Sequence, residues 1–432
     1  MNFFNLKKIS NYKALIFKEV SAQVFEKIVR IFVGLVVIKS LSFYLGPENY
    51  GVLNFIESYY LILYGLAMFG LDIVITKNLV KLKEKQGIHD LISNSIFLLF
   101  ILSLIFYSLN ILILNNFIDF RFENLILLIS LLLFLNPFLV IEYFLTSKNQ
   151  LRYISFVRLI AYLLSSSLKL TAIYYKVELE IFIIIMMIEN IMVFIGYIYL
   201  MRNKIKLFKY KLNINLNILL RIFKESLPIF LYGMGAILYS RIDIFMIQRY
   251  LTETDLGNYT ASFKLIAFLM FLPGILSTSF FPKIVAESDY SLDSVYIKKM
   301  YRYTFSFSIF LLIFCLISGP IMINLLFGEK FESSLLIYNI LIFIIVISSI
   351  SAVYTKVIYS VNLQDRLLLR SIIGIFINII CNYFFIKAYG VVGSAIATIL
   401  SLIFIELIYD FFDPKLKPYH QVKLKSILTY EK

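Results

Sequence analysis

Long, mostly apolar runs recur along this chain, and they constrain its fold more than any other feature of the sequence. Leu125–Leu135 and Leu335–Ile347 are two such runs, and neither contains a charged residue. Hydrophobic residues make up 60% of the 432-residue sequence and charged residues only 16%, too little polar surface for a soluble protein of this length. The ten-residue alternation of a transmembrane barrel is absent from the sequence. The sequence therefore predicts an all-α polytopic membrane protein.

These runs predict about twelve membrane-spanning helices. Their approximate bounds are 25–45, 50–75, 91–114, 123–146, 152–175, 179–201, 224–250, 257–280, 301–325, 333–357, 367–387 and 389–410. The connections placed in the cytoplasm carry basic clusters, as in residues 77–85, whereas each outer connection carries at most a single basic residue. This bias predicts that both termini lie in the cytoplasm. It also accounts for the net charge of +14 without a nucleic-acid partner.

A basic, Asn-rich connection at residues 202–221 divides the chain into two halves that resemble each other. We expect an N-terminal six-helix bundle at 1–201, a cytoplasmic linker at 202–221, and a C-terminal six-helix bundle with a short basic tail at 222–432. Gly51 corresponds to Gly257 in the second half. Such repeats predict a pseudo-two-fold axis along the membrane normal and a cavity between the halves, an architecture typical of transporters.

Cysteine and histidine are rare and scattered. Cys315 and Cys381 lie inside apolar runs, and His89 and His420 lie in polar connections. Their placement indicates neither a disulfide framework nor a metal site. We therefore expect no resident cofactor.

Several short motifs occur in a fixed order along almost the whole chain. They are LGPENYG at Leu45–Gly51, FGLDIVITK at Phe69–Lys77, SLPIFLYG, SRIDIFMI and LGNYTASFKL within Ser226–Leu265, FLPGILSTSFFPKI at Phe271–Ile284, and AYGVVGSAIATILS at Ala388–Ser401. With these motifs the sequence resembles the polysaccharide flippases of the MATE-like MOP exporter superfamily, the Wzx-type translocases of O-antigen and capsule repeat units.

The resemblance implies a fold, an activity and a set of partners. It implies two pseudo-symmetric MATE-like bundles around a central, often cationic cavity. It implies a flippase, not an enzyme, that carries undecaprenyl-pyrophosphate-linked oligosaccharide across the bacterial inner membrane by alternating access, for O-antigen or other surface polysaccharide. Membrane lipids, a polysaccharide polymerase and a chain-length regulator are the further partners implied. The two extra helices of the lipid II flippase relatives are not expected here.

Charged residues inside the predicted spans are the candidate functional residues, because a charge at membrane depth needs a partner or water. A pyrophosphate carries several negative charges, and cationic side chains can replace its hydration, arginine through paired hydrogen bonds. We expect Arg241 and Lys264 to bind phosphates or acidic sugars, with Arg158 and Arg30 as further cavity cations. Two alternatives are open: Arg30 can pair with a glutamate one turn away, and Arg241 can bridge to an acid or another helix.

Three acids also lie deep in the predicted spans: Asp243, Glu57 and Glu189. A deep carboxylate can take up H⁺ or Na⁺ and couple the movement of cargo to an ion gradient. The alternative is that each acid is the partner of a cation, as Glu57 would be for Lys264. Uncharged donors in the spans can contact sugar hydroxyls or form interhelical hydrogen bonds; they include Asn136, Asn378 and Asn382.

Two rival functions are weighed against a flippase. A multidrug or organic-cation antiporter of the same superfamily would have a cavity dominated by acids and aromatic rings, whereas the deeper charges here lean basic. A membrane polysaccharide polymerase would add a large outer loop or an acid–base motif. Neither is apparent, and no histidine lies in a predicted span.

Overall fold

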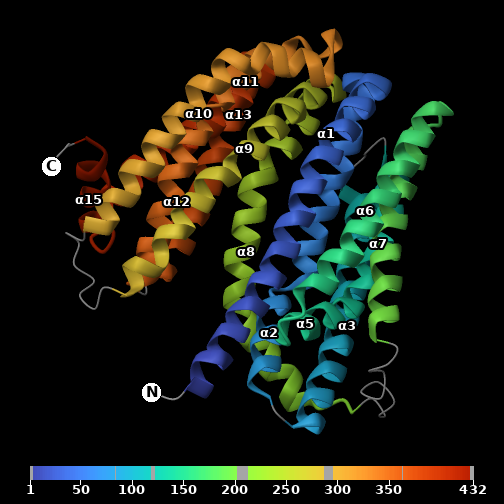
Figure 1. Cartoon of the computed structure of the whole chain (residues 1–432). Coiled ribbons are helices and arrows are strands. Elements are labelled where there is room, and N and C mark those ends of the chain that lie inside the picture. The colour runs from blue at the N-terminus through green and yellow to red at the C-terminus, as the bar shows by residue number, and fades with distance from the viewer. Residues whose placement is uncertain are drawn as a thin grey trace. The chain divides into compact units, whose positions relative to one another are not determined.

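The computed structural model describes residues 3–82, 84–117, 122–201, 213–286, 295–361 and 363–428, and every regular element within them is helical (Figure 1). The α-helices are α1 (Phe3–Met68), α2 (Leu71–Lys81), α3 (Lys85–Phe117), α4 (Glu123–Ser130), α5 (Val140–Ser147), α6 (Leu151–Tyr174), α7 (Leu179–Met201), α8 (Leu216–Tyr250), α9 (Glu253–Ala286), α10 (Val295–Phe327), α11 (Ser333–Leu341), α12 (Ile344–Ser360), α13 (Gln364–Ile403), α14 (Asp410–Phe412) and α15 (Lys417–Leu428). Between them lie the 3₁₀ segments η1 (Leu131–Leu139) and η3 (Glu329–Phe331) and the π-helical η4 (Phe404–Tyr409). The predicted all-α class is confirmed.

Nine helical stretches of the described residues are long and apolar enough to span a membrane. Two of them, Lys18–Met68 and Asp365–Phe412, have 51 and 48 residues. A straight helix of that length would measure about 75 Å, more than twice the ~30 Å of the hydrocarbon layer. Gly46 (φ 67°) and Gly390 (φ 58°) interrupt them with backbone angles that favour glycine. Each long stretch is therefore long enough for two crossings, as expected from the predicted spans 25–45 and 50–75 and from spans 367–387 and 389–410.

The chain forms two compact units. Unit 1 comprises Met1–Tyr44 and Ile56–Met234, and unit 2 comprises Leu45–Phe55 and Gly235–Lys432. These bounds differ from the predicted bundles 1–201 and 222–432, because α1 and α8 are each divided between the units. Residues 202–212 of the predicted linker lie outside the described residues, and residues 216–221 belong to α8. The pseudo-symmetry of the halves stays a prediction.

In unit 1, the end of α1 is held by a stack of aromatic rings. Phe69 lies between Phe223 and Phe230 of α8, with ring centroids 4.7 and 4.2 Å away. Phe69 and Gly70 both have positive φ, and a Cβ added to Gly70 would lie 2.9 Å from the backbone nitrogen of Phe230. Glycine is therefore required at the break between α1 and α2.

A proline shapes the segment of unit 1 that precedes α5. Pro137 lies within η1 and has no N–H to donate. The carbonyl of Leu133, four residues earlier, instead accepts a hydrogen bond from Ser103 Oγ of α3 (2.8 Å). Asn136 lies within η1, directly before Pro137, and Glu142 lies in the first turn of α5; both become part of the pocket described below.

In unit 2, the segment 45–55 packs closely on α9. A Cβ added to Gly257 would lie 1.9 Å from the carbonyl oxygen of Pro47, and one added to Gly51 would lie 2.2 Å from that of Glu253. Tyr50, next to this contact, is buried between the rings of two phenylalanines from α10 and η3. Gly51 and Gly257, which correspond to each other in the two halves of the sequence, thus both permit the close backbone contact between segment 45–55 and α9.

Candidate functional site

Unit 1 contains a pocket of about 320 Å³ within its helices. Its lining comes from α1, η1, α5, α6 and α7. The charged and amide side chains among these residues are Arg30, Asn136, Glu142, Arg158, Glu189 and Asn190. Two of the four predicted cavity cations, Arg30 and Arg158, are therefore brought to one pocket.

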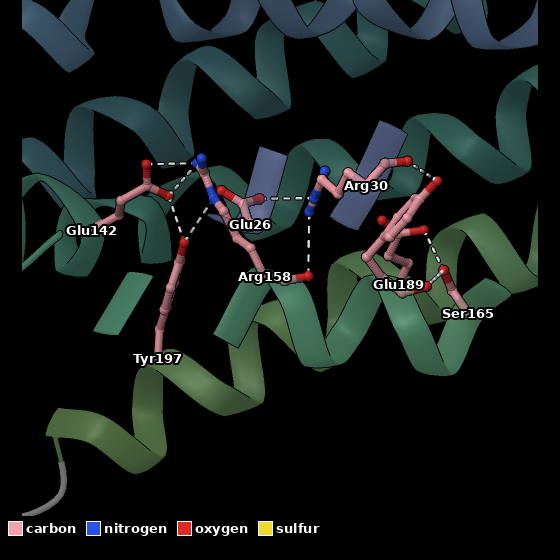
Figure 2. A network of polar contacts seen from close by, with 8 residues as sticks. Glu26, Arg30, Glu142, Arg158, Ser165, Glu189 and Tyr197 are labelled. Atoms are coloured by element: carbon pink, nitrogen blue, oxygen red, sulfur yellow. Dashed lines mark hydrogen bonds and ion pairs between the residues drawn. The ribbon is translucent and has the colours of Figure 1, made fainter. Parts of the chain in front are cut away.

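Arg158 of α6 is the centre of the first polar group in this pocket (Figure 2). Its Nη2 donates to both carboxylate oxygens of Glu142, at 2.6 and 2.7 Å, and its Nε donates to the Tyr197 hydroxyl at 3.2 Å. The Tyr197 hydroxyl in turn donates to Glu142 at 2.7 Å. The Arg158 side chain is nevertheless 42% exposed and that of Glu142 15% exposed. The pair is thus neutralised but still accessible from the pocket.

Arg30 of α1 lies in the same network (Figure 2). Its Nε is 2.8 Å from Glu26, one turn earlier, so the predicted alternative of a local ion pair is confirmed. Its Nη2 donates to the backbone carbonyl of Arg158 (3.2 Å), and its guanidinium lies 4.8 Å from the centre of the Tyr162 ring. Arg30 therefore ties α1 to α6 as well as lining the pocket.

The three deep acids lie in different surroundings. Glu189 accepts a hydrogen bond from Ser165 Oγ (2.6 Å; Figure 2) and lies 3.6 Å from Lys169 Nζ, so it has the cation partner that was its alternative role. Glu57 is exposed on α1. Only Asp243 is both deep in a predicted span and buried, with 4% of its surface exposed.

Asp243 of α8 is held by uncharged groups of unit 2. It accepts hydrogen bonds from the Tyr259 hydroxyl (2.8 Å), Thr398 Oγ1 (2.8 Å) and Asn382 Nδ2 (2.7 Å). Asn382 Oδ1 accepts in turn from Ser394 Oγ (2.8 Å). These bonds join α8, α9 and α13, which confirms interhelical hydrogen bonding for Asn382. They surround a buried carboxylate with two hydroxyl donors and one amide N–H donor, none of them charged.

The remaining predicted cations lie in unit 2, and neither lines the pocket of unit 1. Arg241 is half-buried on α8. Lys264 is half-buried on α9, with its Nζ 5.2 Å from the centre of the Tyr50 ring. Their binding of phosphate stays a prediction.

Unit 2 also holds a four-charge cluster that sequence reasoning missed. Lys423 of α15 lies 2.9 Å from Asp410 and 3.4 Å from Glu406, and its Nζ donates to the Glu406 carbonyl at 2.6 Å. Arg370 of α13 pairs with both acids. The i,i+4 spacing of Glu406 and Asp410 inside an apolar run is a signal of such a cluster, whereas Lys423 falls in the short basic tail predicted at the C-terminus.

His420 lies beside this cluster, on the same helix as Lys423, α15. It is 2% exposed. Burial disfavours its charged form, and the nearby Lys423 adds to the effect, so the pKa of His420 is lowered to about 4. His420 is therefore neutral at physiological pH.

Apolar helices of spanning length around internal polar clusters define a multi-pass helical membrane protein. A family model described as "Polysaccharide biosynthesis protein" matches residues 16–288, and the chain belongs to that family. A Haloferax volcanii protein named "Probable low-salt glycan biosynthesis flippase Agl15" is 24% identical over 191 residues, which cover 41% of this chain and 40% of that protein. The chain thus matches well under half the length of this curated relative.

Two solved structures share the fold. The lipid II flippase MurJ, in an inward closed conformation, has a TM-score of 0.67 at 16% identity, covering 95% of this chain and 90% of MurJ. An inward-facing MATE multidrug transporter of the MOP superfamily has a TM-score of 0.67 at 13% identity, covering 91% of this chain and 94% of the transporter. The predicted MATE-like fold is confirmed, and the proteins to which the chain is similar here are named as flippases and transporters.

Proposed function

We propose that this protein is a flippase that moves undecaprenyl-pyrophosphate-linked oligosaccharide repeat units across the bacterial inner membrane by alternating access. The flipped units would serve O-antigen or other surface polysaccharide, with both termini of the protein in the cytoplasm. The observation that carries the proposal is the polar pocket of unit 1, enclosed by helices of spanning length in a chain of the polysaccharide biosynthesis family. Its partners would be the lipid-linked oligosaccharide, membrane lipids, the polymerase and the chain-length regulator.

The cations take separate parts in this proposal. Arg241 and Lys264 contact the diphosphate in this proposal, because they are half-buried cations inside predicted spans. Arg158 and Arg30 contact the glycan, since both line the pocket.

Transport is coupled to H⁺ or Na⁺ at Asp243 in this proposal. Tyr259, Thr398 and Asn382, which donate hydrogen bonds to Asp243, are all uncharged, so its negative charge would be balanced by a bound cation or proton. Asp243→Asn removes that charge and keeps the side chain's size. We expect it to abolish the dependence of flipping on the ion gradient in proteoliposomes; unchanged dependence would contradict the role of Asp243.

The flippase itself is tested in cells that lack the gene. Wild-type protein should restore surface polysaccharide, and Arg241→Ala should not, while reaching the same level in the membrane. Without a functional protein, lipid-linked repeat units should accumulate on the cytoplasmic leaflet. Normal surface polysaccharide with Arg241→Ala would remove Arg241 from the mechanism. Export of organic cations without any effect on polysaccharide would favour the antiporter instead.

A further inference from the structure

The pocket of unit 1 is balanced in charge. Two arginines and two glutamates line it, and each of the two arginines has a carboxylate at hydrogen-bonding or ion-pairing distance. A diphosphate entering such a pocket would have to displace an existing carboxylate and would gain no net positive field. The pocket therefore suits an uncharged ligand better than a bare anion.

The polar groups of the pocket match the hydroxyl groups of a sugar. Each sugar hydroxyl both donates and accepts a hydrogen bond. The guanidinium of Arg158 offers hydrogen-bond donors and the carboxylate of Glu142 beside it offers acceptors. Asn190 adds an amide to the same lining. Adjacent hydroxyls of one ring could therefore bond to a donor and to an acceptor without disturbing the charge balance.

Asn136 supplies an independent sign of a ligand. Its side chain lines the pocket and is 98% buried, being 2% exposed, and its Nδ2 has no hydrogen-bond partner in the described residues. A buried N–H group without a partner costs free energy, so such groups are normally satisfied by protein, water or ligand. The amide of Asn136 is thus an unused donor in the pocket wall.

Aromatic rings form other parts of the lining. Tyr60 and Tyr64 of α1 have ring centroids 6.1 Å apart, and Phe138 and Phe194 have centroids 4.2 Å apart. The C–H face of a sugar ring is apolar and can pack on such surfaces, while its edge carries the hydroxyls. A volume of about 320 Å³ is at the small end of ligand pockets, so it would hold part of an oligosaccharide.

We propose that this pocket is a subsite for an uncharged sugar ring of the cargo, held by Asn136, Glu142 and Arg158 and packed on the tyrosines of α1. The inference rests on the proposed function and assigns the glycan, not the diphosphate, to unit 1. Glu142 acts here as the hydrogen-bond acceptor and Arg158 as the donor of a pair that has no net charge. Asn136 gains the partner that it lacks.

The test uses the full-length protein in nanodiscs and saturation-transfer NMR with free probes. The neutral probes are glucose, galactose and N-acetylglucosamine; the anionic probes are glucuronate and inorganic pyrophosphate. We expect at least one neutral sugar to bind. Asn136→Asp, which replaces both N–H donors of the amide, and Glu142→Gln should each weaken that binding about tenfold, as expected for a lost hydrogen bond to a buried group.

Glu19→Gln is the matched control, because Glu19 also pairs with an arginine of α6 (Arg152, 3.4 Å) but does not line the pocket. It should bind the neutral sugar as the wild type does, and thermal unfolding should verify that all variants are folded. Binding of pyrophosphate or glucuronate strengthened by Glu142→Gln would overturn the proposal in favour of an anion site. Absence of binding by every neutral probe would overturn it as well. Neither result touches the flippase proposal, which is decided by polysaccharide export in cells.

Discussion

The two units each contain an ion-paired cluster, but only one of them is open to a cavity. In unit 1 the Arg158 side chain is 42% exposed and faces a pocket. In unit 2 the side chains of Lys423 and Asp410 are 1% and 0% exposed. Both clusters pair cationic side chains with carboxylates. The difference in exposure, not in charge, therefore separates a candidate binding site from an ion-pair cluster that only stabilises the fold.

The unit 2 cluster is sealed by local structure. The π-helical η4 carries Glu406, whose carbonyl accepts from Lys423, and α15 brings that lysine under the Tyr354 ring, 4.3 Å from its centre. Two positive and two negative side chains then satisfy one another away from water. Removing one partner of such a group leaves an uncompensated buried charge, which is far more costly than losing an exposed pair.

The largest expected effect is on this sealed cluster. Lys423→Met should lower the free energy of unfolding by about 3–5 kcal/mol, because Asp410 and Glu406 lose a buried cation. Lys425→Met, at an exposed position of the same helix, is the control. Equal unfolding midpoints for the two variants in detergent would show that the cluster does not stabilise the fold.

A second prediction concerns pH. The pKa of His420 is lowered to about 4 from a usual 6.5, so the unfolded chain binds a proton between these values that the folded chain does not. Stability should therefore fall as pH drops from 6.5 to 4, by about 2–3 kcal/mol from this group. Thermal unfolding across that range measures it. His420→Gln should flatten the dependence, and an unchanged slope would contradict the assignment.

The accessible pair of Glu142 and Arg158 in unit 1 should affect function strongly and stability only weakly. Glu142→Gln should reduce surface polysaccharide about tenfold but change unfolding by less than ~1 kcal/mol, because the pair is partly exposed. Glu19→Gln is again the control for losing a carboxylate in unit 1. Severe destabilisation by Glu142→Gln would show that the unit 1 cluster, like that of unit 2, mainly stabilises the fold.

The smallest effect is expected at the local pair on α1. Glu26→Gln removes an i,i+4 partner of Arg30 and should cost less than about 0.5 kcal/mol. Because Arg30 would keep its bond to the Arg158 carbonyl, the pocket should persist. Sugar binding equal to that of the wild type would verify this, and its loss would show that Glu26 orients Arg30 for the ligand.

Several features of the site were predictable because they depend on neighbours in the sequence. The pairing of Glu26 with Arg30 follows from helical spacing, and the breaks near Gly46 and Gly390 fall where the apolar runs were divided. Others were not predictable. Asp243 and Thr398 are 155 residues apart, and no local pattern indicates that they share a hydrogen bond.

The sequence by itself determined the class of this protein: apolar run length, loop charge and motif order specify an all-helical membrane protein of the polysaccharide biosynthesis family. These are local or additive properties that each segment carries alone. Only the tertiary structure decided which charges are open and which are sealed, that Lys423 is a core residue, and that segment 45–55 belongs to unit 2. Burial and pairing arise between segments far apart in the chain, so no single segment contains that information.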